Sequence, residues 1–185
     1  MEKREFVLAA VASVGFLTNK IGNRLGAIAV DGYSVRVTPA RQGRLHLLGL
    51  LNNIQSAPRQ DHAAGRRPDS AASTAGLAAG VRQLCGPARR RGLAVVVSDL
   101  LGPTDWADEL KRAGVFHDTL VIEVIDPREL ELPDVGMLTV VDPERGAVRG
   151  VNTPDRKLRP RYAESAAAHR AEHARLLRHA AAHPP

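Results

Sequence analysis

The feature that most constrains the fold is an uncharged run, LAVVVS at Leu93–Ser98, which is followed at once by Asp99. A continuous apolar run of this length is typical of a strand that is buried on both faces, as in the middle of a parallel sheet. In open α/β sheets, ligands bind just beyond the carboxyl ends of the parallel strands. We therefore interpret Asp99 as a candidate ligand-binding residue, whose alternative role is to cap the turn or helix that follows.

Helical and strand patterns alternate along the rest of the chain, which favours an α/β fold with a parallel or mixed sheet and helices on both faces. Apolar residues at helical spacing predict a buried helix at Lys3–Asn19. Further helices are predicted at Leu45–Ile54, Thr74–Arg91 and Leu158–Ala182. Another is predicted to begin at Thr104 or Asp105 and to run through Lys111, and Gly114 is expected to end it. Strands are predicted at Arg24–Val30, Tyr33–Thr38, Leu93–Ser98, Thr119–Ile125, Gly136–Val141 and Ala147–Val151. Pro39 is expected to end the second of these strands.

The length of 185 residues predicts a single domain over 1–185, with a flexible loop at 56–73 and a frayed C-terminus at 180–185. Cys85 is the one cysteine, so no disulfide forms within the chain, and this fits the reducing cytoplasm. No apolar run approaches the roughly 18 residues of a membrane span. We therefore expect a cytoplasmic protein without a membrane partner.

The chain is basic, with a net charge of +6 and arginine clusters at 66–67, 89–91 and 156–161. Such clusters can attract nucleic acid through its phosphates. Aromatic residues make up only 3% of the chain, however, and bases stack on aromatic side chains in many nucleic-acid interfaces. We interpret the arginines as solvated surface residues and keep nucleic-acid binding as an alternative.

Other residues with possible chemistry have simpler interpretations. Asp126 follows the next predicted strand and is interpreted as a turn residue before Pro127. Glu123 lies inside that strand and needs a partner if it faces the core. Cys85 lacks a nearby motif that supplies a base, so we expect a buried structural thiol. His169 and His173 share a helix face, but two ligands alone do not make a zinc site.

Four stretches of the chain together resemble one known family. They are EKREFVLAAVASVGFLTNKIGNRLGAIAV (2–30), PARQGRLHLLGLL (39–51), RRRGLAVVVSDLLGP (89–103) and HDTLVIEVIDPRELELPDVGMLTVVDPERG (117–146). They look like the uncharacterised bacterial family with a von Willebrand factor A-like domain, which carries a domain-of-unknown-function label and is usually encoded beside MoxR-type AAA+ ATPases. The resemblance covers about residues 2 to 178, and the last stretch is its most specific part.

The resemblance implies a Rossmann-like, mostly parallel sheet with a metal-ion-dependent adhesion site that holds Mg²⁺ at its carboxyl edge. Asp99 matches the family's aspartate after the fourth strand, and Thr74 matches, weakly, its threonine from a later loop. No Asp-x-Ser-x-Ser loop occurs in the sequence. The resemblance thus implies an incomplete metal site, which we expect to bind no ion in this chain.

By the same resemblance, the chain is truncated at both ends, as a fragment or mis-started gene product would be. The family's first, central strand would lie between Arg24–Val30 and Leu93–Ser98, and its last strand would follow the final helix. Without the central strand, we expect these two strands to lack a neighbour, to pair with each other, or to pair with a second chain.

The function that the resemblance implies is that of a non-enzymatic protein-interaction module. It would be an accessory of a MoxR-like AAA+ ATPase in chaperone-like assembly or maturation of other proteins. Self-association of the chain through its unpaired strands is a second possible protein interaction. A metal-dependent enzyme that uses Asp99 and Asp126 is the weakest alternative, since no base or nucleophile accompanies them.

Overall fold

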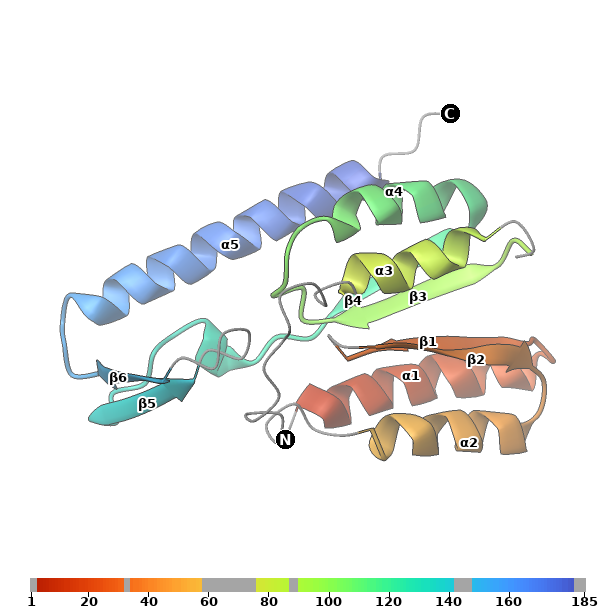
Figure 1. The fold of residues 1–185 in the computed structure, drawn as a ribbon, viewed down its shortest axis with the longest axis horizontal. Coiled ribbons are helices and arrows are strands. Elements are labelled where there is room, and N and C mark those ends of the chain that lie inside the picture. Colours follow the sequence, from red (N-terminus) through yellow and green to blue (C-terminus); the bar gives the residue numbers. More distant parts are fainter. Residues whose placement is uncertain (1–2, 32–33, 58–75, 87–89, 142–147, 182–185) are drawn as a thin grey trace. The chain divides into compact units, whose positions relative to one another are not determined.

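The computed structural model describes residues 3–31, 34–57, 76–86, 90–141 and 148–181. These form two compact units (Figure 1). The first unit contains the elements α1 to β4 together with the last residues of α5, and the second contains β5, β6 and most of α5. The prediction of a single domain over 1–185 stays a prediction. Within the described ranges, no helix combines the length and the apolar character that crossing a bilayer requires.

The first helix, α1 (Lys3–Lys20), forms as predicted but is much less buried than expected. Gly15 is its one buried residue, whereas Phe6 and Phe16 are each nearly half exposed. The expectation of a buried helix was wrong because apolar residues surround the whole helix, and the described structure covers only one of its faces. The helix ends at Lys20, and Gly22 follows it with a φ of 79°, which lets Asn23 donate its N–H back to the carbonyl of Thr18.

A hairpin and a second helix complete the N-terminal half of the first unit. Strand β1 (Leu25–Val30) pairs antiparallel with β2 (Val35–Arg41), and α2 (Arg44–Gln55) follows with Leu47 and Leu50 buried. Pro39 does not end β2, contrary to the prediction. The strand continues because it lies at the edge of the hairpin, where a missing N–H is tolerated, and the pairing register is irregular at this point.

A parallel βαβ unit forms the other half of the first unit. Strand β3 (Leu93–Ser98) has the predicted bounds and pairs in parallel with β4 (Asp118–Glu123), and α4 (Trp106–Phe116) connects them. Helix α4 continues past Gly114, contrary to the prediction, because that glycine is packed inside the unit. The short helix α3 (Leu77–Arg82) packs against α4 and is continued by a 3-10 turn.

The core of this unit contains one tryptophan. Trp106 is 1% exposed, and the remaining buried hydrophobic residues include Leu47, Leu50, Ala78, Val81, Ala94, Val96, Leu100, Leu110 and Ala113. All but the tryptophan are aliphatic, as expected for a chain with so few aromatic residues.

The second unit is built on another hairpin and a long helix. Strands β5 (Met137–Val141) and β6 (Val148–Asn152) pair antiparallel, and α5 (Leu158–Ala181) follows, all close to their predicted bounds. Thr153 anchors the hairpin, because its fully buried hydroxyl accepts the N–H of Val135 at 2.9 Å and donates to the carbonyl of Gly136 at 2.7 Å.

The described strands form three two-stranded sheets, of which only β3–β4 is parallel. The fold class is therefore mixed α/β, as predicted, while the expected single, mostly parallel sheet is not present among these strands. In the described part of the chain, β1 pairs with β2 alone and β3 with β4 alone. Direct pairing of β1 with β3, which was one of the outcomes expected for these two strands, is therefore not present in the described part of the chain.

Candidate functional site

The candidate site lies where β3 ends. The chain turns sharply there: the hydroxyl of Ser98 accepts the N–H of Leu100 at 3.1 Å, and Oδ1 of Asp99 lies 3.4 Å from the N–H of Leu101. Leu100 is in the left-handed region, with a φ of 57°, and its side chain is 1% exposed. A leucine in this conformation is strained, so burial of its side chain holds the turn in place. The turn presents the Asp99 carboxylate beyond the carboxyl edge of the strand.

The partner of this carboxylate is an ammonium group from the first turn of α1. Nζ of Lys3 lies 2.9 Å from Oδ2 of Asp99, and both side chains are about one-third exposed. The cation at the edge of β3 is therefore part of the protein itself. A divalent ion bound to the same oxygen would have to displace or repel the lysine.

The residues around Asp99 do not fit a magnesium site by themselves. Mg²⁺ requires several oxygen ligands in near-octahedral geometry. The described residues bring the Asp99 carboxylate, the Ser98 hydroxyl and the Lys3 ammonium to this edge, where Glu123 ends the neighbouring strand. In the described ranges there is no group of three or more His, Cys, Asp or Glu that could hold a metal ion. Thr74, the other predicted ligand, lies outside these ranges.

Two further acids lie in the next strand or just after it. Glu123 is half-buried at the end of β4, in register with Ser98 on β3. Asp126 belongs to the second unit and is half-buried directly before a 3-10 turn, Pro127–Glu129, where its carbonyl accepts the N–H of Glu129 at 2.9 Å. The turn role predicted for Asp126 is confirmed.

Glu109 on α4 is a buried charge that the sequence did not reveal. Its carboxylate side chain is 8% exposed, and it accepts Nε of Arg82 at 3.0 Å and lies 3.2 Å from Nη1 of Arg112. The signal that could have found it is its position next to Leu110 and three residues after Trp106, on the inward face of the helix. Arg82 comes from α3, so the pair ties the two helices together.

Cys85 sits close to this cluster. Burial raises the pKa of its thiol, the Glu109 carboxylate raises it further, and the Arg112 guanidinium partly offsets both. A thiol with a raised pKa is a poor nucleophile at neutral pH, because little thiolate is present. The thiol is half-buried, less than expected, and the structural role predicted for it stays a prediction.

His169 and His173 share a face of α5, as predicted. Their ring centroids are 4.3 Å apart, and His173 is 2% exposed. His173 is therefore buried, and the pair is not part of any metal-binding group among the described residues.

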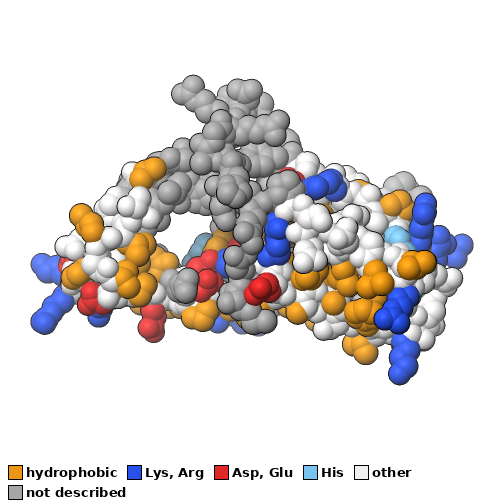
Figure 2. All heavy atoms as spheres, turned by 90° about the horizontal axis from the view of Figure 1, so that it is seen from below, with side chains coloured by type: hydrophobic (Ala, Val, Ile, Leu, Met, Phe, Trp, Pro, Cys, Tyr) orange, Lys and Arg blue, Asp and Glu red, His pale blue; other side chains and the backbone are white. Residues whose placement is uncertain are grey.

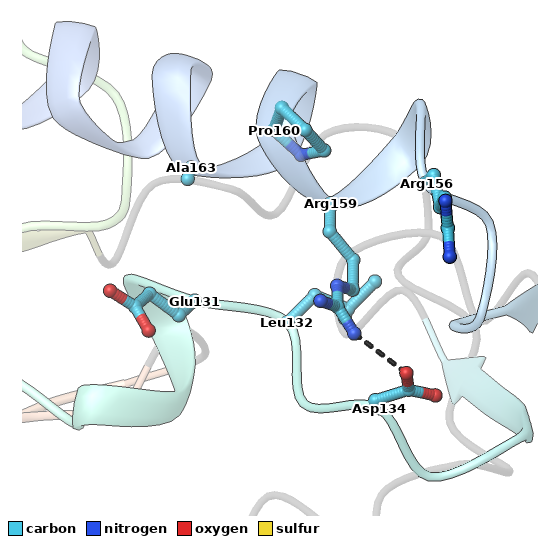
Figure 3. Close-up of a pocket in the computed structure, with 7 residues that line it drawn as sticks. All are labelled: Glu131, Leu132, Asp134, Arg156, Arg159, Pro160 and Ala163. Atoms are coloured by element: carbon cyan, nitrogen blue, oxygen red, sulfur yellow. Dashed lines mark hydrogen bonds and ion pairs between the residues drawn. The ribbon is translucent and has the colours of Figure 1, made fainter.

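The second unit also contains an open pocket of about 580 Å³ between the start of α5 and the segment before β5. Figure 3 shows its lining, in which an ion pair joins Nη1 of Arg159 to Oδ2 of Asp134 at 2.8 Å. Its remaining lining residues are Glu131, Leu132, Arg156, Pro160 and Ala163. Acidic and basic side chains balance there, so the pocket has no net charge to select a ligand.

The arginine clusters are only partly described. Arg66, Arg67 and Arg89 lie outside the described residues. Arg91 has an acidic neighbour, since its Nη2 lies 3.7 Å from Oδ1 of Asp118. Of the 156–161 cluster, Arg159 is held by an acid in the pocket just described.

The described part of the chain is thus a mixed α/β protein with a candidate site at the end of a parallel βαβ unit. A family described as "Protein of unknown function DUF58" matches residues 1–172, and the chain belongs to that family. No solved structure shows a significant match to the chain.

The relatives are uncharacterised mycobacterial proteins. One from Mycobacterium tuberculosis (strain ATCC 25618 / H37Rv) and one from Mycobacterium bovis are each 44% identical over 177 residues, which are 96% of this chain and 53% of the relative. A protein of Mycobacterium avium is 44% identical over 140 residues, which are 76% of this chain and 77% of that protein. The chain therefore spans about half the length of the first two relatives.

Proposed function

We propose that this chain is a non-enzymatic protein-interaction module that binds an extended strand of a partner along the open edges of β1 and β3. One observation carries the proposal. Each described strand has a single hydrogen-bonded neighbour, and helix α1 contacts both β1 and β3. An open strand edge is a template for pairing with another chain, and two such edges share one helix here.

The backbone groups that β3 offers to a partner follow from its ladder with β4. The carbonyls of Gly92 and Ser98 accept the N–H groups of Asp118 in β4 and of Val124 just after it, at 3.1 and 2.9 Å. Alternate residues of a parallel strand bond to the same neighbour, so Val95 and Val97 direct their N–H and C=O groups away from β4. Both side chains are half-buried. This edge therefore offers regularly spaced donors and acceptors for an added strand.

The partner in this proposal is a MoxR-like AAA+ ATPase, which the module would assist in the cytoplasm in chaperone-like assembly or maturation of other proteins. The basis for this partner is the resemblance to von Willebrand A-like proteins, and the parallel β3–α4–β4 unit is consistent with that kind of fold. Pairing with a second copy of the chain is the other form of strand addition. A metal bridge to the partner is not part of the proposal, because Lys3 already pairs with Asp99.

The test compares two proline variants of β3. Val97→Pro removes an N–H that points to the open edge, whereas Val96→Pro removes one that bonds to β4. We expect wild-type protein to capture a MoxR-like AAA+ ATPase, or to self-associate in sedimentation analysis, and Val97→Pro to lose that binding while it retains a cooperative unfolding transition. Val96→Pro should unfold the βαβ unit.

Two outcomes contradict the proposal. One is a folded wild-type chain that stays monomeric at every concentration and captures no ATPase. The other is a folded Val97→Pro variant that binds as tightly as the wild type, which would place the contact away from the open edge of β3.

A further inference from the structure

The most exposed large hydrophobic side chains described in the first unit gather at one end, where α1 ends and α2 begins. Leu45 is 87% exposed, Ile21 79% and Leu17 69%. A single exposed leucine is ordinary on a protein surface. Three at the same end, including the first turn of α2 and the residue just after α1, are a feature that packing within the unit does not explain.

Hydrogen bonds hold this end in a defined shape. Oδ1 of Asn19 accepts the N–H of Gly43 at 3.2 Å, and the side-chain amide of Gln42 donates to the carbonyl of Gly22. These contacts join the end of α1 to the segment that leads into α2. The exposed side chains on the two segments therefore lie on one surface rather than on two independent loops.

The surface is also strongly basic. We name it the basic tip, which consists of the exposed residues Lys20, Ile21, Arg24, Arg41, Arg44 and Leu45. The sequence has no Asp or Glu in residues 17–24 or 40–48, so no acid of these segments neutralises the four cations. Figure 2 looks onto the side of α1 and α2 that faces away from the strands. At its right-hand end, it shows Lys and Arg side chains intermingled with hydrophobic ones.

We propose that the basic tip docks on the anionic surface of a lipid bilayer. Ile21 and Leu45 would enter the headgroup region, while the four cations pair with lipid phosphates. Protruding aliphatic side chains surrounded by Lys and Arg are the combination that binds such surfaces, through buried apolar area and attraction to anionic lipid together. The contact needs no spanning helix. The inference therefore replaces the expectation of no membrane partner, which rested on the lack of a long apolar run.

Two other partners fit the tip less well. Nucleic acid would use the cations, but single-stranded nucleic acid also gains binding from bases that stack on aromatic side chains, and the tip has none. A protein partner usually buries aromatic or arginine anchors in pockets. The large pocket described above belongs to the second unit, not to the tip.

The test is co-sedimentation of the chain with vesicles of phosphatidylcholine alone or with added phosphatidylglycerol. We expect binding to the anionic vesicles only, with an affinity that falls as salt is added. Arg41→Gln and Arg44→Gln should each weaken binding about fivefold. Ile21→Ser and Leu45→Ser should each weaken it about tenfold, because the buried aliphatic surface is lost.

The matched control is the double variant Lys111→Gln, Val115→Ser on α4. It removes one exposed cation and one exposed aliphatic side chain from another part of the same unit, and it should bind like the wild type. Urea unfolding of each variant confirms that it is folded. Equal binding to neutral vesicles overturns the proposal, as does a control that loses as much affinity as the tip variants. Displacement by an RNA homopolymer, with no effect of Leu45→Ser, would assign the tip to nucleic acid instead.

Discussion

The ammonium group of Lys3 lies 2.9 Å from Oδ2 of Asp99, across 96 positions of sequence. The lysine opens α1 and the aspartate follows β3, so the pair fastens the N-terminal helix to the carboxyl edge of the parallel strand pair. It also places a permanent positive charge at the one edge where the sequence predicted a metal ligand. The chemistry of Asp99 in this chain is therefore that of an ion-pair partner.

Removing the lysine should open this edge to divalent cations. Lys3→Met takes away a positive charge that repels Mg²⁺, and we expect the affinity of the chain for Mg²⁺, measured by isothermal titration calorimetry, to rise about tenfold. Lys20→Met on the same helix is the matched control and should leave the affinity unchanged. A Lys3→Met, Asp99→Asn double variant should lose the gain. Equal gains in Lys3→Met and Lys20→Met would mean that net charge alone is responsible.

The turn at Leu100 should invert the usual order of two substitutions. Leu100→Ala removes a buried side chain and keeps the strained φ of 57°, so it should cost about 2–4 kcal/mol in the free energy of unfolding. Leu100→Gly loses the same packing but relieves a left-handed strain of about 1–2 kcal/mol. We expect the glycine variant to be the more stable of the two in urea unfolding. An alanine variant that is the more stable one contradicts the strained turn.

Local patterns were enough to find most of the elements. The uncharged run Leu93–Ser98 became β3 with the same bounds, and the leucine spacing in residues 45–54 placed α2 within one residue at each end. The spacing of apolar residues shows which of them share a face, and this spacing indicates whether the segment forms a helix or a strand. The exposure of α1 was missed because a helix with apolar residues on all sides does not show how many of its faces are covered.

Long-range pairing could not be read in the same way. The partner of each strand depends on the whole chain, so the separate β1–β2 and β3–β4 sheets had no local signal. The pairing of Lys3 with Asp99 is equally nonlocal. Sequence reasoning normally assigns an acid such as Glu109 to solvent. Its burial depends on ion pairs with Arg112 on the same helix and with Arg82, which approaches from another helix.

Two glycines should respond in opposite ways to alanine. A Cβ at Gly80 would lie 2.5 Å from Cγ2 of Val30, a branched side chain with little freedom to move, so Gly80→Ala should destabilise the chain by about 1–3 kcal/mol. Gly49 lies within α2 with open space around it, and Gly49→Ala should stabilise by up to about 1 kcal/mol. Thermal and urea unfolding measure both. Val30→Ala should rescue Gly80→Ala, and failure of that rescue would remove the proposed clash.

The thiol of Cys85 provides a pH test of the cluster around Glu109. Burial, and then the Glu109 carboxylate, raise the pKa of the thiol above its ordinary value, while Arg112 lowers it in part. Because only the thiolate reacts with iodoacetamide, the pH midpoint of alkylation should be higher in the folded chain than in the chain unfolded by urea. Glu109→Gln should lower that midpoint, and Arg112→Gln should raise it. Because the pKa of the thiol is higher in the folded chain than in the unfolded one, the protonated thiol contributes to the stability of the fold. This contribution is fully present below the pKa of the thiol in the unfolded chain, and it is lost as the pH rises through the pKa of the thiol in the folded chain. A folded midpoint at or below the unfolded value, or shifts of the same sign in both variants, would contradict this arrangement of charges.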